Sequence, residues 1–153
     1  MKVSKIEYFV NSYKLINTDI SLEDLNAMGE NTMVAHLGIV FTQIEVDKLV
    51  AKMPVDARTV QPYGILHGGA SLSLAETLGS VAAHCSIDSK KYMSVGLEIN
   101  ANHVRSARDG YVTGTATPIH IGKSTHVWAI EIVDELSKLV CTSRITMAII
   151  EKK

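Results

Sequence analysis

Residues 61–87 decide how this chain folds, and they read QPYGILHGGASLSLAETLGSVAAHCSI. The pair Gly68-Gly69 marks a turn, and the run from about Gly69 to Ile87 predicts a long helix that is apolar nearly all round. A helix of that kind is buried by the rest of its domain. A lone carboxylate on it, Glu76, is costly to bury unless it has a partner or a function. Glu76 is therefore the first candidate site residue.

Alternating or continuous apolar runs predict strands in the rest of the chain. They lie at 39–46, 49–55, 93–105, 111–118, 124–133 and 139–150. The first two form a hairpin with Asp47-Lys48 as its turn, and His120-Ile121-Gly122-Lys123 is a later turn. A single helix can be covered on all sides only if a sheet curls about it. The predicted fold is α+β, with an antiparallel sheet of about six strands wrapped around one long central helix.

Two segments precede the main domain, which we place at residues 31–153. Residues 1–30 read as an N-terminal extension, with a hint of an amphipathic helix from Ile6 to Tyr13. Ser21-Leu22-Glu23-Asp24 resembles a capping box that opens a short helix ending near Gly29. The edges of the predicted sheet need covering, and pairing with a second copy is the usual solution. We therefore expect a dimer or a dimer of dimers.

The composition excludes several classes of function. The chain has 153 residues and a net charge of −1, with its 15 basic and 16 acidic residues intermingled, so no basic stripe for nucleic acid is present. No apolar run is long enough to span a membrane, and the first residues are too polar for a signal peptide. Cys85 and Cys141 look like free, packed thiols, which fits a cytoplasmic protein. The six histidines lack ligand spacing, so no metal site is expected.

Polar groups near the start of the long helix suggest chemistry on an acyl group. Gln61 and His67 lie just before the unpaired N–H groups of Gly68 and Gly69, which can hold an oxyanion. The neighbours of Glu76 on its own helix face are mostly small, among them Ser80, so a substrate could reach the carboxylate. Each residue alone has a structural explanation: an ion-paired or solvent-facing Glu76, a simple glycine turn, a loop amide, a hydrogen-bonded histidine. Their combination favours the site.

Basic residues follow one of the predicted strands. Val95, Leu97, Ile99 and Ala101 alternate onto one face, and His103 and Arg105 continue that parity. Further basic side chains nearby are Arg108, His120, Lys123 and His126. Such groups at an edge suit a phosphorylated ligand, and an ordinary solvated rim is the alternative.

From Leu37 to Ile150 the chain resembles the hotdog-fold acyl-CoA thioesterases. The closest branch acts on aromatic acyl-CoAs such as 1,4-dihydroxy-2-naphthoyl-CoA and 4-hydroxybenzoyl-CoA. The resemblance rests on QPYGILHGG at 61–69 followed by Leu74-Ala75-Glu76, and on VGLEINANHVRSAR at 95–108. His120-Ile121-Gly122 and Val127-Trp128 add to it.

The resemblance implies roles for individual residues. Glu76 would be the nucleophile or the base that activates water, and the Gly68 N–H would polarise the thioester carbonyl. Gln61 and His67 would orient the thioester and the departing sulfur, and Ser80 would help to place the water. A further set would hold coenzyme A: Gly96, His103, Val104, Arg105, Ser106, His120, Ile121, Gly122, Lys123, Ser124 and Thr125.

The implied function is hydrolysis of an aromatic acyl-CoA to the free acid and coenzyme A, as in menaquinone biosynthesis. The family builds its site at a dimer interface, so a homodimer or homotetramer is implied, with no cofactor beyond the coenzyme A of the substrate. Alternatives are a broad phenylacetate-type thioesterase, which usually carries Asp where this chain has Glu76, and a hotdog dehydratase for 3-hydroxyacyl thioesters. A non-catalytic acyl-CoA-binding protein is the third.

Overall fold

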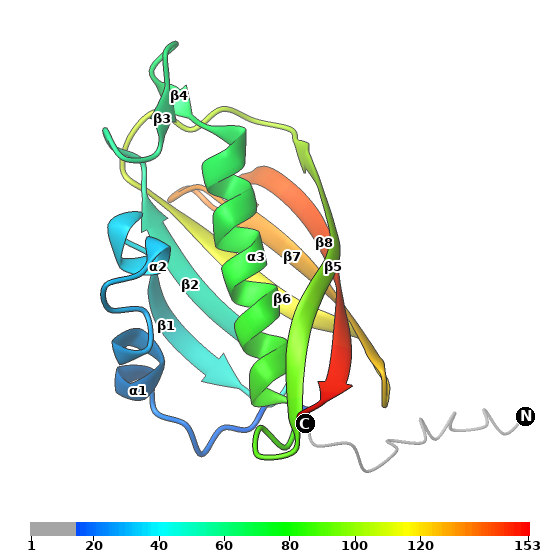
Figure 1. Ribbon diagram of the computed structural model, residues 1–153. Coiled ribbons are helices and arrows are strands. Elements are labelled where there is room, and N and C mark those ends of the chain that lie inside the picture. Colours follow the sequence, from blue (N-terminus) through cyan, green and yellow to red (C-terminus); the bar gives the residue numbers. More distant parts are fainter. Residues whose placement is uncertain (1–14) are drawn as a thin grey trace, which may run out of the picture.

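The computed structural model describes residues 15–153; the helix expected from Ile6 to Tyr13 lies outside them. A six-stranded antiparallel sheet has the order β1-β2-β6-β7-β8-β5, and one long helix, α3 (Gly68–Cys85), crosses its concave face (Figure 1). The predicted sheet around a central helix is thus confirmed. The strands are β1 (Val40–Glu45), β2 (Lys48–Pro54), β5 (Tyr92–His103), β6 (Tyr111–Ile121), β7 (Thr125–Val133) and β8 (Leu139–Glu151). The pair β3 (Val60–Gln61) and β4 (Ile65–Leu66) forms a small separate ribbon before α3.

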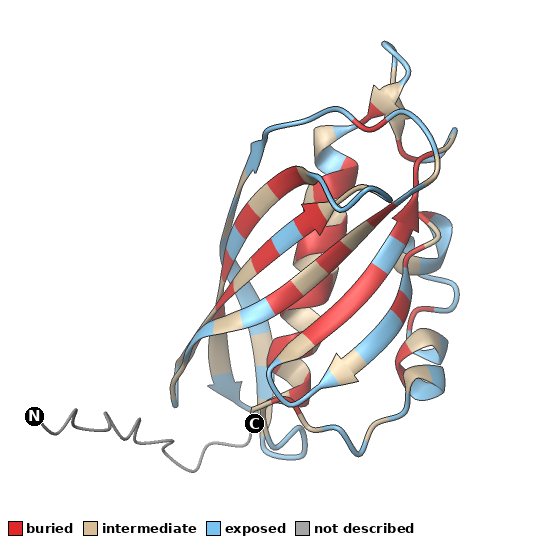
Figure 2. Ribbon diagram, turned by 180° about the vertical axis from the view of Figure 1, so that it is seen from behind, coloured by how far each residue is buried: buried red, intermediate tan, exposed pale blue. Residues whose placement is uncertain are grey.

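The core lies between α3 and the sheet. Leu74 and Leu78 of the helix are fully buried, as are Trp128 and Ile145 of the sheet. Gly79 lets the helix approach β8 closely, because a side-chain carbon there would collide with Ile145. Seen from behind, buried and exposed residues alternate along the strands that cover the helix (Figure 2). This alternation keeps one face of the sheet on the core.

The opposite face of α3 is less covered than the sequence suggests. Leu72, Ser73, Glu76, Thr77 and Ser80 are only half-buried. The sheet wraps one side of the helix, so the expectation of a helix buried all round is wrong for this single copy of the chain. Glu76 therefore lies at a partly open surface and not in a closed core.

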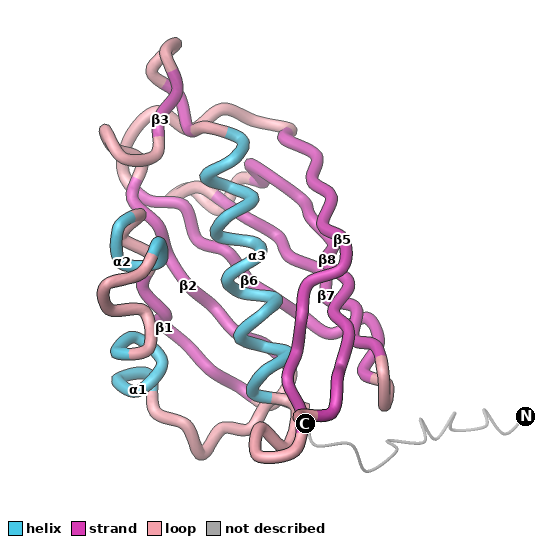
Figure 3. The backbone as a smooth tube through the Cα atoms, viewed as in Figure 1, coloured by secondary structure: helices cyan, strands magenta, loops and turns pink. Residues whose placement is uncertain are grey.

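Short helices cover one edge of the sheet, and among residues 15–153 no element covers the other edge, strand β5. Figure 3 shows α1 (Leu22–Ala27) and α2 (Met33–His36) beside β1, at the opposite edge from β5. The Asn26 side chain completes that covered edge, because it accepts from the Phe41 N–H at 2.8 Å and donates to the Phe41 carbonyl at 3.1 Å. The predicted cap of α1 is confirmed, since the Ser21 hydroxyl accepts from the Asp24 N–H.

Three local predictions need correction. The first hairpin turns at Val46-Asp47, because Lys48 already pairs with Glu45. Strand β6 continues past Pro118 to Ile121, which shortens the next turn to residues 122–124. Proline lacks a ladder N–H, and a bulge between Pro118 and His120 accommodates it.

A second bulge changes which side chains of β5 share a face. Leu97 is the extra residue between Gly96, opposite Met147, and Glu98, opposite Thr146. Val95 therefore pairs with Ala148 on the outer face, whereas Ile99, Ala101 and His103 pair with the helix-facing residues Ile145, Ser143 and Cys141. The single alternating face expected from Val95 to Arg105 is wrong. Among the described residues, no helix is both long and apolar enough to cross a membrane.

Candidate functional site

The first turn of α3 presents a backbone donor. His67 caps the helix, since its Nδ1 accepts from the Gly69 N–H at 2.8 Å, and its carbonyl accepts from Ala70 and Ser71. The Gly68 N–H has no hydrogen-bond partner among residues 15–153. Free N–H groups at a helix start carry partial positive charge and bind anionic oxygens. Gly68 is thus a ready donor for an oxyanion.

A cavity of about 370 Å³, which we call the Gln61 cavity, lies in front of this donor. Gln61 hydrogen-bonds the Tyr63 N–H through Oε1 at 2.7 Å, so its amide NH₂ stays available to a ligand. His103 closes one side, because a side-chain carbon at Gly68 would lie 2.9 Å from His103 Nε2. The predicted residues that line this cavity are Gln61, Gly68, His103, Val104, Arg105 and Ser106.

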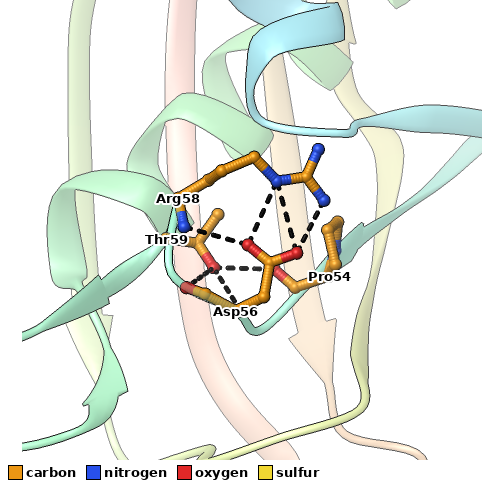
Figure 4. Close-up of polar contacts among 4 residues, drawn as sticks. All are labelled: Pro54, Asp56, Arg58 and Thr59. Atoms are coloured by element: carbon orange, nitrogen blue, oxygen red, sulfur yellow. Dashed lines mark hydrogen bonds and ion pairs between the residues drawn. The ribbon is translucent and has the colours of Figure 1, made fainter.

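A compact turn fixes the ribbon that carries Gln61 (Figure 4). The buried Thr59 hydroxyl donates to the Pro54 carbonyl at 2.7 Å and accepts from the Asp56 N–H at 3.1 Å. Arg58 pairs with Asp56 at 2.6 Å, and its hydrogen bonds lower the pKa of that carboxyl to about 2. The Thr59 carbonyl accepts from the His67 N–H at 2.8 Å, so the same turn holds the start of α3. Sequence reasoning missed this turn, although an Asp whose side chain accepts from the backbone N–H two residues later is a known turn pattern.

The candidate carboxylate lies two turns further along α3. Ser80 Oγ donates to Glu76 Oε1 at 3.0 Å. Gly96 of β5 leaves room beside it, because a side-chain carbon there would lie 3.0 Å from Glu76 Oε1. No cation pairs with Glu76 among residues 15–153. Ser80, expected on the same helix face, thus meets Glu76, and so does Gly96, which the resemblance assigned to coenzyme A.

Glu76 opens onto a cavity of about 300 Å³, the Glu76 cavity. Its other walls come from α2, the segment between α2 and β1, α3 and β5: Met33, Val34, Leu37, Ile39, Leu72, Ser73, Thr77 and Ile99. A mostly apolar pocket with one carboxylate suits an apolar acyl group next to a reacting carbonyl. Sequence reasoning missed the α2 residues, because a four-residue helix gives too short a periodic pattern to detect.

A third cavity, the Arg58 cavity, lies on the His67 side of the helix start and measures about 400 Å³. It is lined by Met33, Leu37, Arg58, Thr59, Val60, His67, Gly69, Ala70 and Ser73. His67 thus lines this cavity and, unlike Gln61 and Gly68, is absent from the walls of the Gln61 cavity. With Nδ1 used for the cap, only its Nε2 is available to a ligand.

The two halves of the candidate site are separated within one chain. Gly68 and Glu76 are eight residues apart on α3, which corresponds to about 12 Å along a helix. They also line different cavities. A carbonyl held by the Gly68 N–H therefore cannot meet Glu76 of the same chain.

The remaining predicted ligand residues lie at the far end of the sheet (Figure 1). His120, Ile121, Gly122, Lys123, Ser124 and Thr125 surround the β6–β7 turn, closed by the Gly122 N–H on the Thr125 carbonyl at 2.9 Å. Strand β8 gives the distance from this turn to the Gln61 cavity. Its Cys141 pairs with His103 at the cavity and its Met147 pairs with His126 near the turn, and this separation of six strand residues spans about 20 Å. His126 does not belong to a basic rim, because it is 2% exposed and burial lowers its pKa.

Known proteins resemble this chain in sequence and in fold. The family model of the thioesterase superfamily matches residues 63–141, just over half of the chain. The 1,4-dihydroxy-2-naphthoyl-CoA hydrolase of Escherichia coli is 56% identical, over 86% of this chain and 96% of that protein. The proofreading thioesterase EntH of Klebsiella pneumoniae is 48% identical, over 86% and 96%. The crystal structure of a mutant thioesterase from Pseudomonas aeruginosa superposes with a TM-score of 0.88 at 46% identity, covering 90% of this chain and 99% of that one.

Proposed function

The chain belongs to the thioesterase superfamily, and on that premise we propose that it hydrolyses an aromatic acyl-CoA to the free acid and coenzyme A. The observation that carries the proposal is the Glu76 carboxylate at the wall of an apolar cavity, with the Ser80 hydroxyl bonded to it. The name of the Escherichia coli relative supports a 1,4-dihydroxy-2-naphthoyl group, and with it a place in menaquinone biosynthesis.

The proposed chemistry balances with water as the only co-reactant. In one route a Glu76 oxygen attacks the thioester carbonyl carbon, the C–S bond breaks, and coenzyme A leaves as a thiolate. Water then cleaves the resulting anhydride and restores the carboxylate. In the other route Glu76 removes a proton from water as that water attacks the carbonyl carbon, the C–S bond breaks, and the proton passes from Glu76 to the departing thiolate. In both routes the Gly68 N–H stabilises the negative carbonyl oxygen, and no cofactor is needed because a thiolate is a good leaving group.

The proposed site uses two copies of the chain. The separation of about 12 Å between Gly68 and Glu76 prevents one copy from completing it. Strand β5 supplies a surface for the second copy, since it is an edge that no other part of residues 15–153 covers, with Met93, Val95 and Leu97 exposed. A partner at this edge would bring its own Gln61 cavity toward Glu76, and unpaired sheet edges favour such association. The oligomer we propose is a homodimer or a dimer of such dimers.

The same pairing offers a path for coenzyme A. Arg105 and His103 stand at the Gln61 cavity, and Lys123 at the β6–β7 turn is about 20 Å away on the same chain. We assign the first pair to the nucleotide phosphates, which guanidinium groups bind well. The β6–β7 turn reaches coenzyme A only if the second copy brings it near.

Release of free thiol from a panel of acyl-CoAs tests the function. The panel is 1,4-dihydroxy-2-naphthoyl-CoA, 4-hydroxybenzoyl-CoA, phenylacetyl-CoA and octanoyl-CoA. We expect the highest kcat/KM for the first two, and a kcat lower by about 10²-fold or more in Glu76→Gln, the usual scale for a positioned acid–base group. The matched control is Glu131→Gln, an exposed carboxylate on the outer face of β7. A folded Glu76→Gln protein with near-normal turnover would contradict the proposal, and acyl-CoA binding without turnover in the unaltered chain would mean a binding protein.

A further inference from the structure

The Glu76 cavity and the Arg58 cavity share a wall. Three residues line both cavities: Met33, Leu37 and Ser73. The volumes on the two sides are about 300 Å³ and about 400 Å³. These side chains therefore stand between two neighbouring cavities, one beside Glu76 and one beside Arg58.

Met33 is the exposed member of this wall. Leu37 is 7% exposed and belongs to the core, and the Ser73 hydroxyl is held by the Gly69 carbonyl at 2.9 Å. The Met33 side chain is 62% exposed and stands on the first residue of a four-residue helix that has no buried residue. Methionine is unbranched and adapts its shape to irregular gaps.

We propose that Met33 is a specificity-determining residue that sets the size of the acyl group accepted beside Glu76. This inference rests on the proposed thioesterase function, because it takes the acyl group to occupy the Glu76 cavity. With Met33 in place, the acyl group has a compartment of about 300 Å³. With the side chain shortened, it gains access to the Arg58 cavity.

The chemistry of Met33 supports a role in selection and not in catalysis. Its thioether has no acidic proton to exchange, and it lines the Glu76 cavity from α2, whereas the carboxylate stands on α3. The exposed position also means that substitutions at Met33 do not open the core.

The test compares three aromatic probes of increasing length: benzoyl-CoA, 2-naphthoyl-CoA and 4-phenylbenzoyl-CoA. The measured quantity is the ratio of kcat/KM for 4-phenylbenzoyl-CoA to kcat/KM for benzoyl-CoA. We expect Met33→Ala to raise this ratio by about 10-fold or more, the scale on which apolar pockets discriminate size. Met33→Trp should lower this ratio. It should also lower kcat/KM for 2-naphthoyl-CoA relative to benzoyl-CoA, but by a smaller factor.

The matched control is Met28→Ala. Met28 is 59% exposed at the end of α1 and lines neither cavity, so the ratio should stay at its original value. An unchanged ratio in both Met33 variants, with Glu76-dependent hydrolysis intact, would overturn the role of Met33 and leave the proposed function standing. An equal shift in Met28→Ala would also overturn it. Absence of Glu76-dependent hydrolysis in the unaltered chain would overturn both proposals.

Discussion

Gly68 contributes to the proposed site through its backbone N–H. Its position in α3 allows a substitution to remove that N–H. It is the first residue of the helix, where proline is tolerated because that N–H has no intrahelical partner. The preceding residue, His67, has φ −70° and ψ 133°, the extended conformation that proline requires before it. Gly68→Pro should therefore keep the helix and lower kcat by about 10²–10³-fold, the measured cost of losing one oxyanion donor.

Gly68→Ala is the control for this change, since it adds a side-chain carbon and keeps the N–H. That carbon would lie 2.9 Å from His103 Nε2, so a small shift of the imidazole must accommodate it. We expect a modest rise in KM and a kcat close to normal. Equal losses of kcat in the two variants, measured on proteins with the same circular dichroism spectrum, would show that shape and not the donor matters.

Protonation of His126 should change the stability of the molecule, although His126 has no part in the proposed reaction. Burial lowers its pKa below the ordinary value of 6.5, and nearby His120 adds to that effect. Between the folded pKa and 6.5, the unfolded chain binds a proton that the folded chain does not. The free energy of unfolding should therefore fall as the pH drops below about 6.5 and level off below the folded pKa.

Urea unfolding between pH 5 and pH 8 measures this dependence. His126→Gln should flatten the curve below pH 6.5. The prediction fails if the original chain and His126→Gln have parallel curves.

The turn from Asp56 to Thr59 connects two elements of the site, the β3–β4 ribbon and the start of α3. Thr59→Val keeps the shape of the buried side chain but loses the bonds to the Pro54 carbonyl and the Asp56 N–H. The loss should cost about 1–3 kcal/mol of stability, since a buried carbonyl loses its donor. It should also lower kcat by about 10-fold with KM little changed, because Gln61 and Gly68 lose their alignment.

Thr59→Ser separates a positioning role from a structural one, because it restores the hydroxyl without the methyl group. We expect kcat to recover in Thr59→Ser, while part of the stability loss remains. If thermal stability and kcat fell together in both variants, Thr59 would support the fold alone.

The sequence predicted the elements well where a pattern was long and local. The helix from Gly68, the cap at Ser21 and all six strands of the sheet follow from composition and periodicity. The bulge at Leu97 could not be read in this way, because it depends on which residues of β8 lie opposite. Its effect is large, since it places Val95 outside and His103 inside.

The candidate site was predicted in part for a similar reason. Gln61, Gly68 and Glu76 stand out because a polar group in an apolar or glycine-rich stretch is conspicuous. Thr59 and Met33 do not stand out, because their importance comes from a buried hydrogen bond and a shared cavity wall. Contacts between distant segments create those roles, and no short pattern reports them.

At the scale of the whole molecule, the chain carries two half-sites that face different cavities. The Gln61 cavity offers the oxyanion donor and the basic residues, and the Glu76 cavity offers the carboxylate and the apolar walls. The β5 edge, which is left open by the part of the chain that the structure describes, is where we propose that a second copy joins them. Activity should therefore depend on association, and dilution that separates the copies should abolish turnover.

Complementation between two inactive variants tests whether each site is shared between two copies. Glu76→Gln and Gly68→Pro chains are co-expressed with different affinity tags, and the mixed oligomer is purified through both. If each site takes Glu76 from one copy and Gly68 from the other, a mixed dimer holds one intact site and one doubly altered site. It should recover about half of the normal specific activity, as the two-fold symmetry of such a dimer requires. Activity no higher than that of the separate variants would contradict the shared site.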